Sequence, residues 1–202
     1  MANREIPTIH PDTDTLKAMS HPVRLRMLGL LRSEGPATAS QLAQRLGLNS
    51  GATSYHLRQL ADYGLVKDAP DRGNKRDRWW QAAHQSTRTA LSEENDPDAR
   101  AATMAFWKTA IGEQVRQIQA AAAELDELPR EWADVSGGSD WGIRLTADQA
   151  RELTDRIGAL IDEAMANELP DDELPPDAEP IIFQVHAFPR PGHLTHRDEQ
   201  HS

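Results

Sequence analysis

Residues 38–68, TASQLAQRLGLNSGATSYHLRQLADYGLVKD, decide the fold of this chain. Their first part predicts a short helix, because Leu42, Ala43 and Leu46 fall on one helical face. Gly47 follows where the helix must end in a left-handed residue, a conformation that glycine adopts without steric cost. A second helix can therefore begin a few residues after the first helix ends.

That second helix is predicted over residues 50–63, with Asn49 before it and Gly64 after it. Thr53, Leu57 and Leu60 recur at spacings of four and three, which places them on one buried face. The opposite, solvent-facing side carries Ser50, Ser54, Tyr55 and Arg58. Two helices joined by a tight turn are typical of a helix-turn-helix, whose second helix lies in a DNA groove.

A β-hairpin is predicted directly after the second helix. Residues 65–67 and 78–81 are its strands, and residues 71–74 are its turn. Trp79 and Trp80 point to opposite faces of the return strand, so one of them should pack on the core. Basic residues gather at the tip and flank of the hairpin: Arg72, Lys75, Arg76 and Arg78. Such a hairpin suits a wing that reaches the DNA backbone, and a solvated basic turn is the alternative.

Two more helices are predicted before the helix-turn-helix. Residues 1–11 show no periodicity and are expected to be a flexible arm. Leu16 and Met19 belong to the first of the two helices, and Pro22 suits the first turn of the second. The apolar stripe of this second helix consists of Val23, Met27, Leu30 and Leu31.

Side chains that can cap a helix precede each of these predicted helices. They are Asp12 or Thr13, Thr38 or Ser40, and Asn49, and Ser20 or His21 stands before the helix that begins near Pro22. These helices and the hairpin then complete a domain over residues 12–90.

Residues 20–67 resemble the winged helix-turn-helix of the ArsR family of bacterial repressors. Five features carry the resemblance: Ser20-His21-Pro22 leading into Arg24, the Leu28–Leu31 stretch, Leu42-Ala43, Ser54-x-His56-Leu57, and Gly64-Leu65-Val66. The resemblance covers about residues 12–85 and implies a DNA-binding transcriptional regulator. It also implies that Ser54 and His56 belong to the DNA-reading helix, although His56 suits a partly buried packing role equally well.

The residues expected to contact DNA lie on the two helices and the hairpin. They are Thr38, Gln41, Ser50, Ser54, Tyr55, His56, Arg58, Arg72, Lys75, Arg76 and Arg78. Few of these side chains can make bidentate base contacts. Discrimination between DNA sequences is therefore expected to depend partly on DNA shape and on the wing.

A long helix is predicted over residues 98–128. Its apolar residues recur in a nearly heptad pattern, which is typical of helices that pair with a symmetry mate. The residues expected to form the dimer contact are Trp107, Ile111, Val115, Ile118 and Leu125. Burial of the same stripe against its own chain is the alternative.

The rest of the chain predicts a small strand-helix-strand region over residues 140–188. Residues 141–145 and 181–187 are its expected strands. Thr146 and Gln149 form a capping-box signature that opens a helix between the two strands. Residues 189–202 are expected to be a disordered tail. The fold class is therefore mainly α with small β: a winged helix-turn-helix, a long dimerisation helix and a small α+β region.

The charge of the chain divides unevenly. The net charge is −10, but residues 1–90 hold 13 Lys+Arg against 8 Asp+Glu, and the other residues hold 9 against 24. The first part therefore carries +5 and the second −15. Positive charge lies with the helix-turn-helix, where phosphates would bind, so the overall acidity does not count against double-stranded DNA as a partner.

Several classes of function find no support in the sequence. The chain has no cysteine, so thiolate metal sites are excluded, and residues 98–128 contain no histidine for an imidazole site. His193, His196 and His201 lie in the expected tail, which favours a solvated segment over a metal site. No phosphate loop, nucleophile elbow or metal-ligand spacing appears, so neither an enzyme nor a cofactor is expected. With no membrane span or signal pattern, a cytoplasmic protein is expected.

The sequence therefore predicts a dimeric repressor that binds an inverted-repeat operator and does not sense metals. A winged-helix module for protein contacts is one alternative. A regulator gated by a small organic effector is another, because aromatic residues could line a pocket in the second half of the chain as well as form a core. Those residues are Phe106, Trp107, Trp132, Trp141, Phe183 and Phe188.

Overall fold

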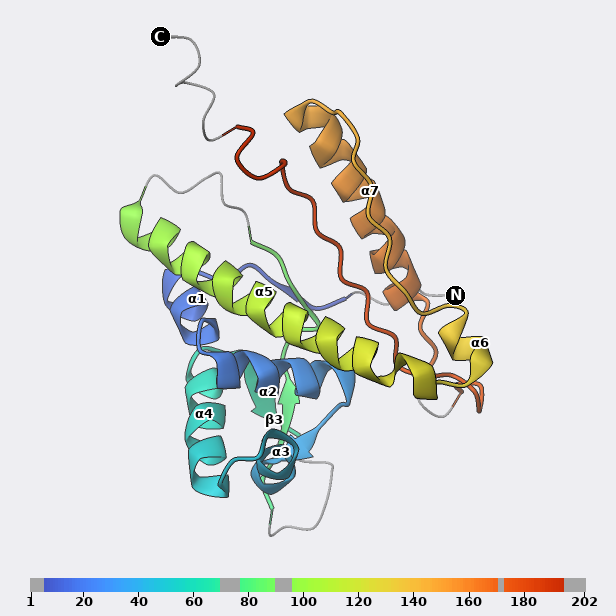
Figure 1. Cartoon of the computed structure of the whole chain (residues 1–202). Helices are drawn as coiled ribbons and strands as arrows, with labels where there is room; N and C mark the ends of the chain where they lie inside the picture. Colours follow the sequence, from blue (N-terminus) through green and yellow to red (C-terminus); the bar gives the residue numbers. More distant parts are fainter. Residues whose placement is uncertain (1–5, 70–76, 90–95, 171–172, 195–202) are drawn as a thin grey trace. The chain divides into compact units, whose positions relative to one another are not determined.

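A computed structural model describes residues 6–69, 77–89, 96–170 and 173–194 (Figure 1). The fold is mainly helical with small sheets, as the sequence predicts. The chain divides into two compact units, Glu5–Gly137 and a carboxyl-terminal unit that begins at Gly138. No helix of the described residues is long and apolar enough to cross a membrane.

The first four helices of the amino-terminal unit are α1 (Thr13–Met19), α2 (Pro22–Ser33), α3 (Ala39–Leu46) and α4 (Ser50–Asp62). Each begins at a side chain that accepts a hydrogen bond from a backbone N–H of the first turn. The capping residues are Asp12, His21, Thr38 and Asn49. Asp12, Thr38 and Asn49 are among the predicted caps.

The tight turn between α3 and α4 depends on Gly47. Its φ is 65°, in the left-handed region, and the N–H of Leu48 donates to the carbonyl of Ala43 at 2.9 Å. Gly64, which follows the end of α4, also has a left-handed φ, of 67°. The predicted helix-turn-helix is thus confirmed in its elements and in its breaks.

A three-stranded sheet follows the order β2-β4-β3, with β2 (Ala37–Thr38), β3 (Val66–Asp68) and β4 (Trp79–Ala82). The hairpin pair β3–β4 is antiparallel, with Val66 opposite Ala82 and Asp68 opposite Trp80. The two strands of the hairpin are as predicted, within a residue. The third strand, β2, was not predicted, because two residues are too few to show a period.

Residues of the expected flexible arm form a strand, which corrects that prediction. Within residues 6–11, β1 (Thr8–Ile9) pairs in parallel with β5 (Ser86–Thr87). Arg32 of α2 fixes β5, since its guanidinium donates to the His84 carbonyl and to Thr87 Oγ1, both at 2.9 Å. Burial lowers the pKa of Arg32 to about 10. Residues 1–5 lie outside the described residues.

The core of the amino-terminal unit lies between its helices and β4. Its apolar residues include Leu16, Met19, Met27, Leu28, Leu31, Leu57, Leu60, Leu65, Trp80 and Phe106. Trp80 is the buried member of the tryptophan pair, as the alternation along the strand predicts. Thr53 is also fully buried, and its hydroxyl donates to the Asn49 carbonyl at 3.1 Å.

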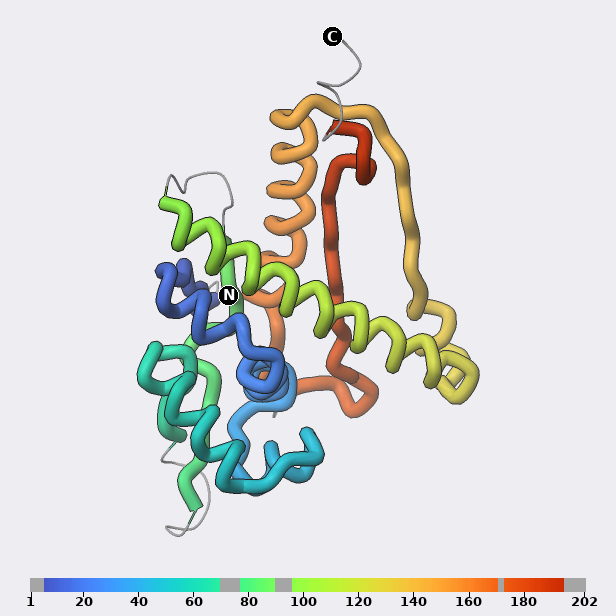
Figure 2. The backbone as a smooth tube through the Cα atoms, turned by 60° about the vertical axis from the view of Figure 1, so that its left-hand side comes forward, coloured from blue at the N-terminus to red at the C-terminus, as the bar shows by residue number. Residues whose placement is uncertain are grey.

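The long helix α5 (Pro97–Glu124) ends in a 3-10 turn, η1 (Leu125–Glu127), and the short α6 (Arg130–Ala133) follows. The first part of α5 packs against α1 and α2, and Ala99, Ala102 and Phe106 are buried there (Figures 1 and 2). Thr109 Oγ1 donates to the Ser20 carbonyl at 2.9 Å. From Ile111 onward the apolar residues of α5 are exposed.

The carboxyl-terminal unit contains α7 (Ala147–Ala166), which begins with the predicted capping box of Thr146 and Gln149. The two strands predicted beside it do not form among the described residues, since residues 141–145 and 181–187 have no regular secondary structure and pair with no strand. The physical reason is that two strands without further cover make a marginal sheet. No residue of α7 is buried.

Candidate nucleic-acid interface

The exposed face of α4 carries the polar residues that the sequence assigned to DNA. Thr53, Leu57 and Leu60 are completely buried and hold α4 against the core. Ser50, Tyr55 and Arg58 are exposed on the other side, and Ser54 is half-buried at its edge. The helix therefore presents hydroxyl groups and one guanidinium to solvent from a rigidly packed base.

The start of α3 is fixed by a reciprocal capping box. Thr38 Oγ1 accepts from the Gln41 N–H at 3.2 Å, and Gln41 Oε1 accepts from the Thr38 N–H at 2.8 Å. Both oxygens are therefore used within the chain. The Thr38 hydroxyl and the Gln41 amide each retain donor hydrogens, which suit contacts to phosphate oxygens.

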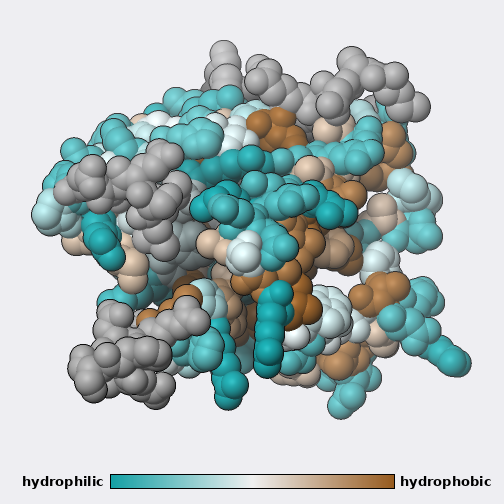
Figure 3. All heavy atoms as spheres, turned by 90° about the horizontal axis from the view of Figure 1, so that it is seen from above, coloured by the Kyte–Doolittle hydropathy of each residue, from teal (hydrophilic) through white to brown (hydrophobic). Residues whose placement is uncertain are grey.

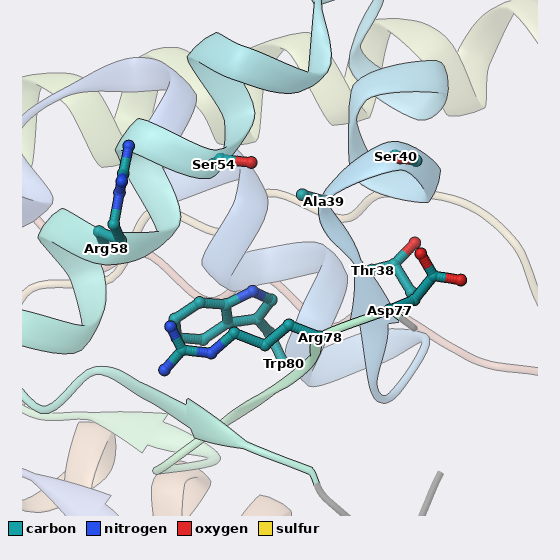
Figure 4. Close-up of a pocket in the computed structure, with 8 residues that line it drawn as sticks. All are labelled: Thr38, Ala39, Ser40, Ser54, Arg58, Asp77, Arg78 and Trp80. Carbon is teal, nitrogen blue, oxygen red and sulfur yellow. The ribbon is translucent and has the colours of Figure 1, made fainter. Parts of the chain in front are cut away.

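The two helices and the sheet meet around a pocket of about 280 Å³. Its lining residues come from β2, α3, α4, β4 and the two residues before β4 (Figure 4): Thr38, Ala39, Ser40, Ser54, Arg58, Asp77, Arg78 and Trp80. Thr38, Ser54, Arg58 and Arg78, four of the predicted DNA-contacting residues, are thus brought together although 40 positions separate the first from the last.

Arg78 is held in place from two sides. Its guanidinium lies 4.0 Å from the centroid of the Trp80 ring. Figure 4 shows the Arg78 side chain lying over the ring. Its Nε and a terminal nitrogen donate to the two Asp68 carboxylate oxygens at 2.5 and 3.1 Å. This bidentate contact lowers the pKa of Asp68. Because both the stacking and the pairing restrict the guanidinium, Arg78 has a defined position at the base of the hairpin.

The other three basic residues of the predicted wing, Arg72, Lys75 and Arg76, lie outside the described residues. Their contribution to the interface remains a prediction. The described part of the hairpin ends at Ala69 on one strand and resumes at Asp77 on the other.

His56 lies on the side of α4 that faces α2. Its ring centroid is 4.7 Å from that of His21 and 5.4 Å from that of Tyr55, and its Nδ1 is buried. Burial lowers the pKa of His56, and the charges of His21 and Arg24 lower it further. These contacts favour the packing role over the DNA-reading role for this residue.

The seam predicted for dimerisation is largely exposed in the single chain. Ile111, Val115, Ile118 and Leu125 have 45, 46, 53 and 42% of their surface exposed. Trp107 differs, because it is partly buried and packs against the core beside Phe106. Four of the five predicted dimer residues are therefore free of the core of their own chain.

The described residues contain no group of three or more His, Asp or Glu side chains that could hold a metal ion. Of the three tail histidines, His196 and His201 lie outside the described residues. The aromatic residues considered for an organic pocket separate into two sets. Phe106 is in the core, whereas Trp141, Phe183 and Phe188 are 83, 71 and 73% exposed.

The comparisons with known proteins concern the same part of the chain. Residues 19–69 match the family described as "Helix-turn-helix domain". Residues 19–69 are a helix-turn-helix domain that matches ArsR-family regulators. The HTH-type transcriptional regulator YgaV of Escherichia coli (strain K12) is 43% identical to this chain over 56 residues. This match covers 28% of the chain and 57% of YgaV, so the chain spans little more than half of that relative.

Two solved structures are also similar to the chain. One is the crystal structure of a "Possible transcriptional regulator for arsenical resistance", with 27% identity, a TM-score of 0.31, and coverage of 61% of this chain and 98% of that one. The other is Lactococcus lactis ZitR, a C30AH42A mutant in apo form, with 14% identity and a TM-score of 0.32. That match covers 72% of this chain and 83% of ZitR.

Within the helix-turn-helix domain, sequence reasoning missed two parts of the interface. One of Trp79 and Trp80 was expected in the core, but the stacking of Arg78 on the Trp80 ring was not expected. The Asp68 partner of Arg78 was also missed, although the cross-strand spacing of Asp68 and Arg78 in a hairpin could have indicated it.

Proposed function

We propose that this protein is a dimeric transcriptional regulator, a repressor, that binds double-stranded DNA through its helix-turn-helix. The observation that carries the proposal is the convergence of Thr38, Ser54, Arg58 and Arg78 around one open pocket. The helix α4 would lie in the major groove, with Arg58 and Arg78 directed at phosphates and Ser54 at base edges.

The distribution of charge supports this proposal. Residues 1–90 carry a balance of +5, whereas the remainder carries −15. Phosphate contacts supply most of the affinity of a DNA-binding protein, and the cationic groups must therefore lie with the helix-turn-helix. If the half with the helix-turn-helix carried the net negative charge instead, its surface would repel DNA.

The exposed seam of α5 supports a homodimer. Ile111, Val115, Ile118 and Leu125 form a row that a second copy would cover. A two-fold dimer would present two α4 helices about one DNA turn, roughly 34 Å, apart. The operator would then be an inverted repeat, since the DNA site mirrors the symmetry of the protein.

We further propose that the regulator is cytoplasmic and does not sense metals through thiolates. The chain contains no cysteine, so the thiolate ligands of a sensor site cannot be formed. Regulation by metal would need a histidine and carboxylate set, and none is formed by the described residues.

The test is the affinity of the full-length chain for duplex DNA as salt is varied, measured on matched arginine variants. Arg58→Ala should weaken binding to all duplexes. It should also reduce the slope of log affinity against log salt concentration by about one ion. Arg151→Ala is the control, because Arg151 lies on α7, pairs with Asp148 at 2.8 Å and should leave DNA binding unchanged. Equal affinities of Arg58→Ala and the unaltered protein at low salt would refute the docking of α4.

A further inference from the structure

Two histidine rings join the start of α2 to the middle of α4, the helix proposed to read DNA. The ring centroids of His21 and His56 lie 4.7 Å apart. Many hydrophilic residues, drawn in teal, stand at the surface in Figure 3, and a histidine on such a surface gains a proton without disturbing the fold. His21 and His56 differ, because each ring has one nitrogen whose protonation the fold opposes.

His21 caps the start of α2 with its ring. Its Nδ1 accepts a hydrogen bond from the Val23 N–H at 3.2 Å. An imidazolium ring carries a hydrogen on both nitrogens and accepts no hydrogen bond. Protonation of His21 would therefore break this contact and leave the first turn of α2 without its cap.

His56 opposes protonation through burial. Its Nδ1 is buried and has no hydrogen-bond partner among the described residues. In the imidazolium form this nitrogen carries a hydrogen, and a buried donor without an acceptor is unfavourable. Two imidazolium rings at the separation of His21 and His56 would also repel each other. The contact between the rings is thus compatible with two neutral histidines and unstable when both are charged.

The groups around the two rings act in the same direction. Burial lowers the pKa of His21 and of His56, and the positive charge of Arg24 on α2 lowers both further. From α4, Tyr55 faces His56 with its ring centroid 5.4 Å away, and its phenol is uncharged at neutral pH. Among the described residues, no carboxylate acts on either ring to favour the charged form.

The elements packed on the other sides of the two rings contribute no opposing charge to them. Lys17 of α1 donates to Asp98 of α5 at 2.6 Å, so these two charges are paired with each other. Closer to the rings, α5 contributes a neutral group, since Thr109 Oγ1 donates to the Ser20 carbonyl at 2.9 Å.

We propose that the contact between His21 and His56 makes DNA binding sensitive to pH: the neutral rings hold α4 against α2, and protonation below about pH 6.5 releases this contact and weakens DNA binding. A binding constellation must be held within about 0.5 Å of its productive position, so a helix that loses one of its supports binds DNA less well. The inference rests on the proposed function, because it requires α4 to bind DNA.

The expected sign follows from proton linkage. Above about pH 6.5 both rings are neutral and the affinity for DNA should not depend on pH. Below that value the affinity should fall, by at most about tenfold per pH unit for each proton that must leave before DNA binds. If the imidazolium charges acted mainly by attracting phosphates, the affinity would rise instead.

Fluorescence anisotropy of the full chain tests this inference, with a labelled duplex from upstream of its own gene and a constant ionic strength. The affinity of the natural chain should be equal at pH 8 and 7 and about three- to tenfold lower at pH 5.5. The affinity of His21→Asn/His56→Gln should stay within about 1.5-fold over the same range, because neither new side chain titrates and asparagine keeps an acceptor at the start of α2. His84→Gln is the matched control: burial also lowers the pKa of His84, which lies outside the pair, so this variant should keep the full decline.

Far-ultraviolet circular dichroism of each protein at pH 8 and 5.5 should show unchanged helix content, since only a local contact is released. If the double variant does not fold, His56→Gln alone replaces it, because this variant leaves the α2 cap in place, and its decline should be at most about half that of the natural chain. Binding at pH 8 without a decline, with a decline that follows global unfolding, or with an equal decline in the folded variant would overturn this inference alone. Absence of binding at pH 8 would overturn the proposed function and this inference with it.

Discussion

The imidazole rings of His21 and His56 lie 4.7 Å apart between centroids and are inclined at 44° to each other. Their contact joins the start of α2 to the middle of α4. His21 Nδ1 accepts from the Val23 N–H at 3.2 Å, so this nitrogen is unprotonated in the folded chain. Arg24 is the nearby cation, and its Nε donates to the Ala18 carbonyl at 2.5 Å. The contact therefore suits two neutral rings.

Stability should fall at mildly acidic pH because of this pair. Burial lowers the pKa of both histidines, and the charge of Arg24 lowers each further. A histidine whose folded pKa is lowered contributes full stability above its unfolded pKa, about 6.5, and loses it as pH falls toward the folded pKa. The melting temperature should therefore be constant from pH 8 to 7 and decline as pH falls below about 6.5.

The double variant His21→Asn/His56→Gln should reduce that decline, since asparagine keeps an acceptor for the helix start and neither new side chain titrates. His84, whose pKa burial also lowers, should leave a residual slope. Thermal denaturation at a series of pH values measures both proteins. A decline as steep as that of the natural chain would show that the pair is not its source.

Asp68 should restrain DNA binding through its contact with Arg78. Replacing Asp68 by Asn removes a negative charge from the hairpin base and leaves the guanidinium stacked on Trp80. The affinity for all duplexes should rise several-fold at low salt and converge with that of the natural chain at high salt. Arg78→Ala should have the opposite effect and lower the affinity. The slope of log affinity against log salt concentration should also fall by about one ion. Fluorescence anisotropy titrations measure both, and a loss of affinity in Asp68→Asn would contradict the assignment.

Ser54 should affect discrimination between DNA sites more than overall affinity. It lies half-buried on α4 beside the pocket, where its hydroxyl can reach a base edge. Ser54→Ala should reduce the ratio of specific to non-specific affinity about 2- to 13-fold, as expected for the loss of one hydrogen bond of about 0.5–1.5 kcal/mol. Competition between an operator duplex and a scrambled one gives this ratio. An unchanged ratio would remove Ser54 from the base-reading residues.

Leu57 should be a sensitive core position of α4. It has no exposed surface and lies in the core cluster, so Leu57→Ala should lower the free energy of unfolding by about 2–5 kcal/mol. Tyr55→Ala, at a side chain that is 53% exposed, should change it by about 0.5 kcal/mol or less. Urea denaturation followed by circular dichroism compares the two variants. Similar losses in both would contradict the burial pattern of this helix.

The α5 seam should control the oligomeric state. Ile118→Glu places a charge in the exposed apolar row and should convert a dimer into a monomer in light scattering at micromolar concentration. Ala120→Glu is the matched control, because Ala120 is exposed two residues away and lies off the apolar row. Dissociation by the control as well as by Ile118→Glu would argue against a specific seam.

The helix-turn-helix could be predicted from the sequence because its determinants are local. Asn49 accepts a hydrogen bond three residues ahead, and Gly47 adopts its left-handed φ within the turn itself. The burial of Thr53, Leu57 and Leu60 follows from helical spacing alone. Each of these features depends on residues that are close together in the sequence.

The parts that could not be predicted depend on distant partners. Thr8 pairs with Ser86, and strands of two residues leave no periodic signal. The contact of His21 with His56 joins two helices, so neither helix shows it alone. The prediction of strands at residues 141–145 and 181–187 failed for a different reason. Their composition favours strands, but a strand also needs the edge of another strand to pair with.

The most direct test of the account is the binding of full-length protein to a labelled duplex from upstream of its own gene, compared with a scrambled duplex at two salt concentrations. Fluorescence anisotropy should show tight binding that prefers the natural duplex and weakens steeply with salt. Weak binding that is equal on both duplexes and insensitive to salt would contradict the proposal that α4 and Arg78 form a DNA-reading surface.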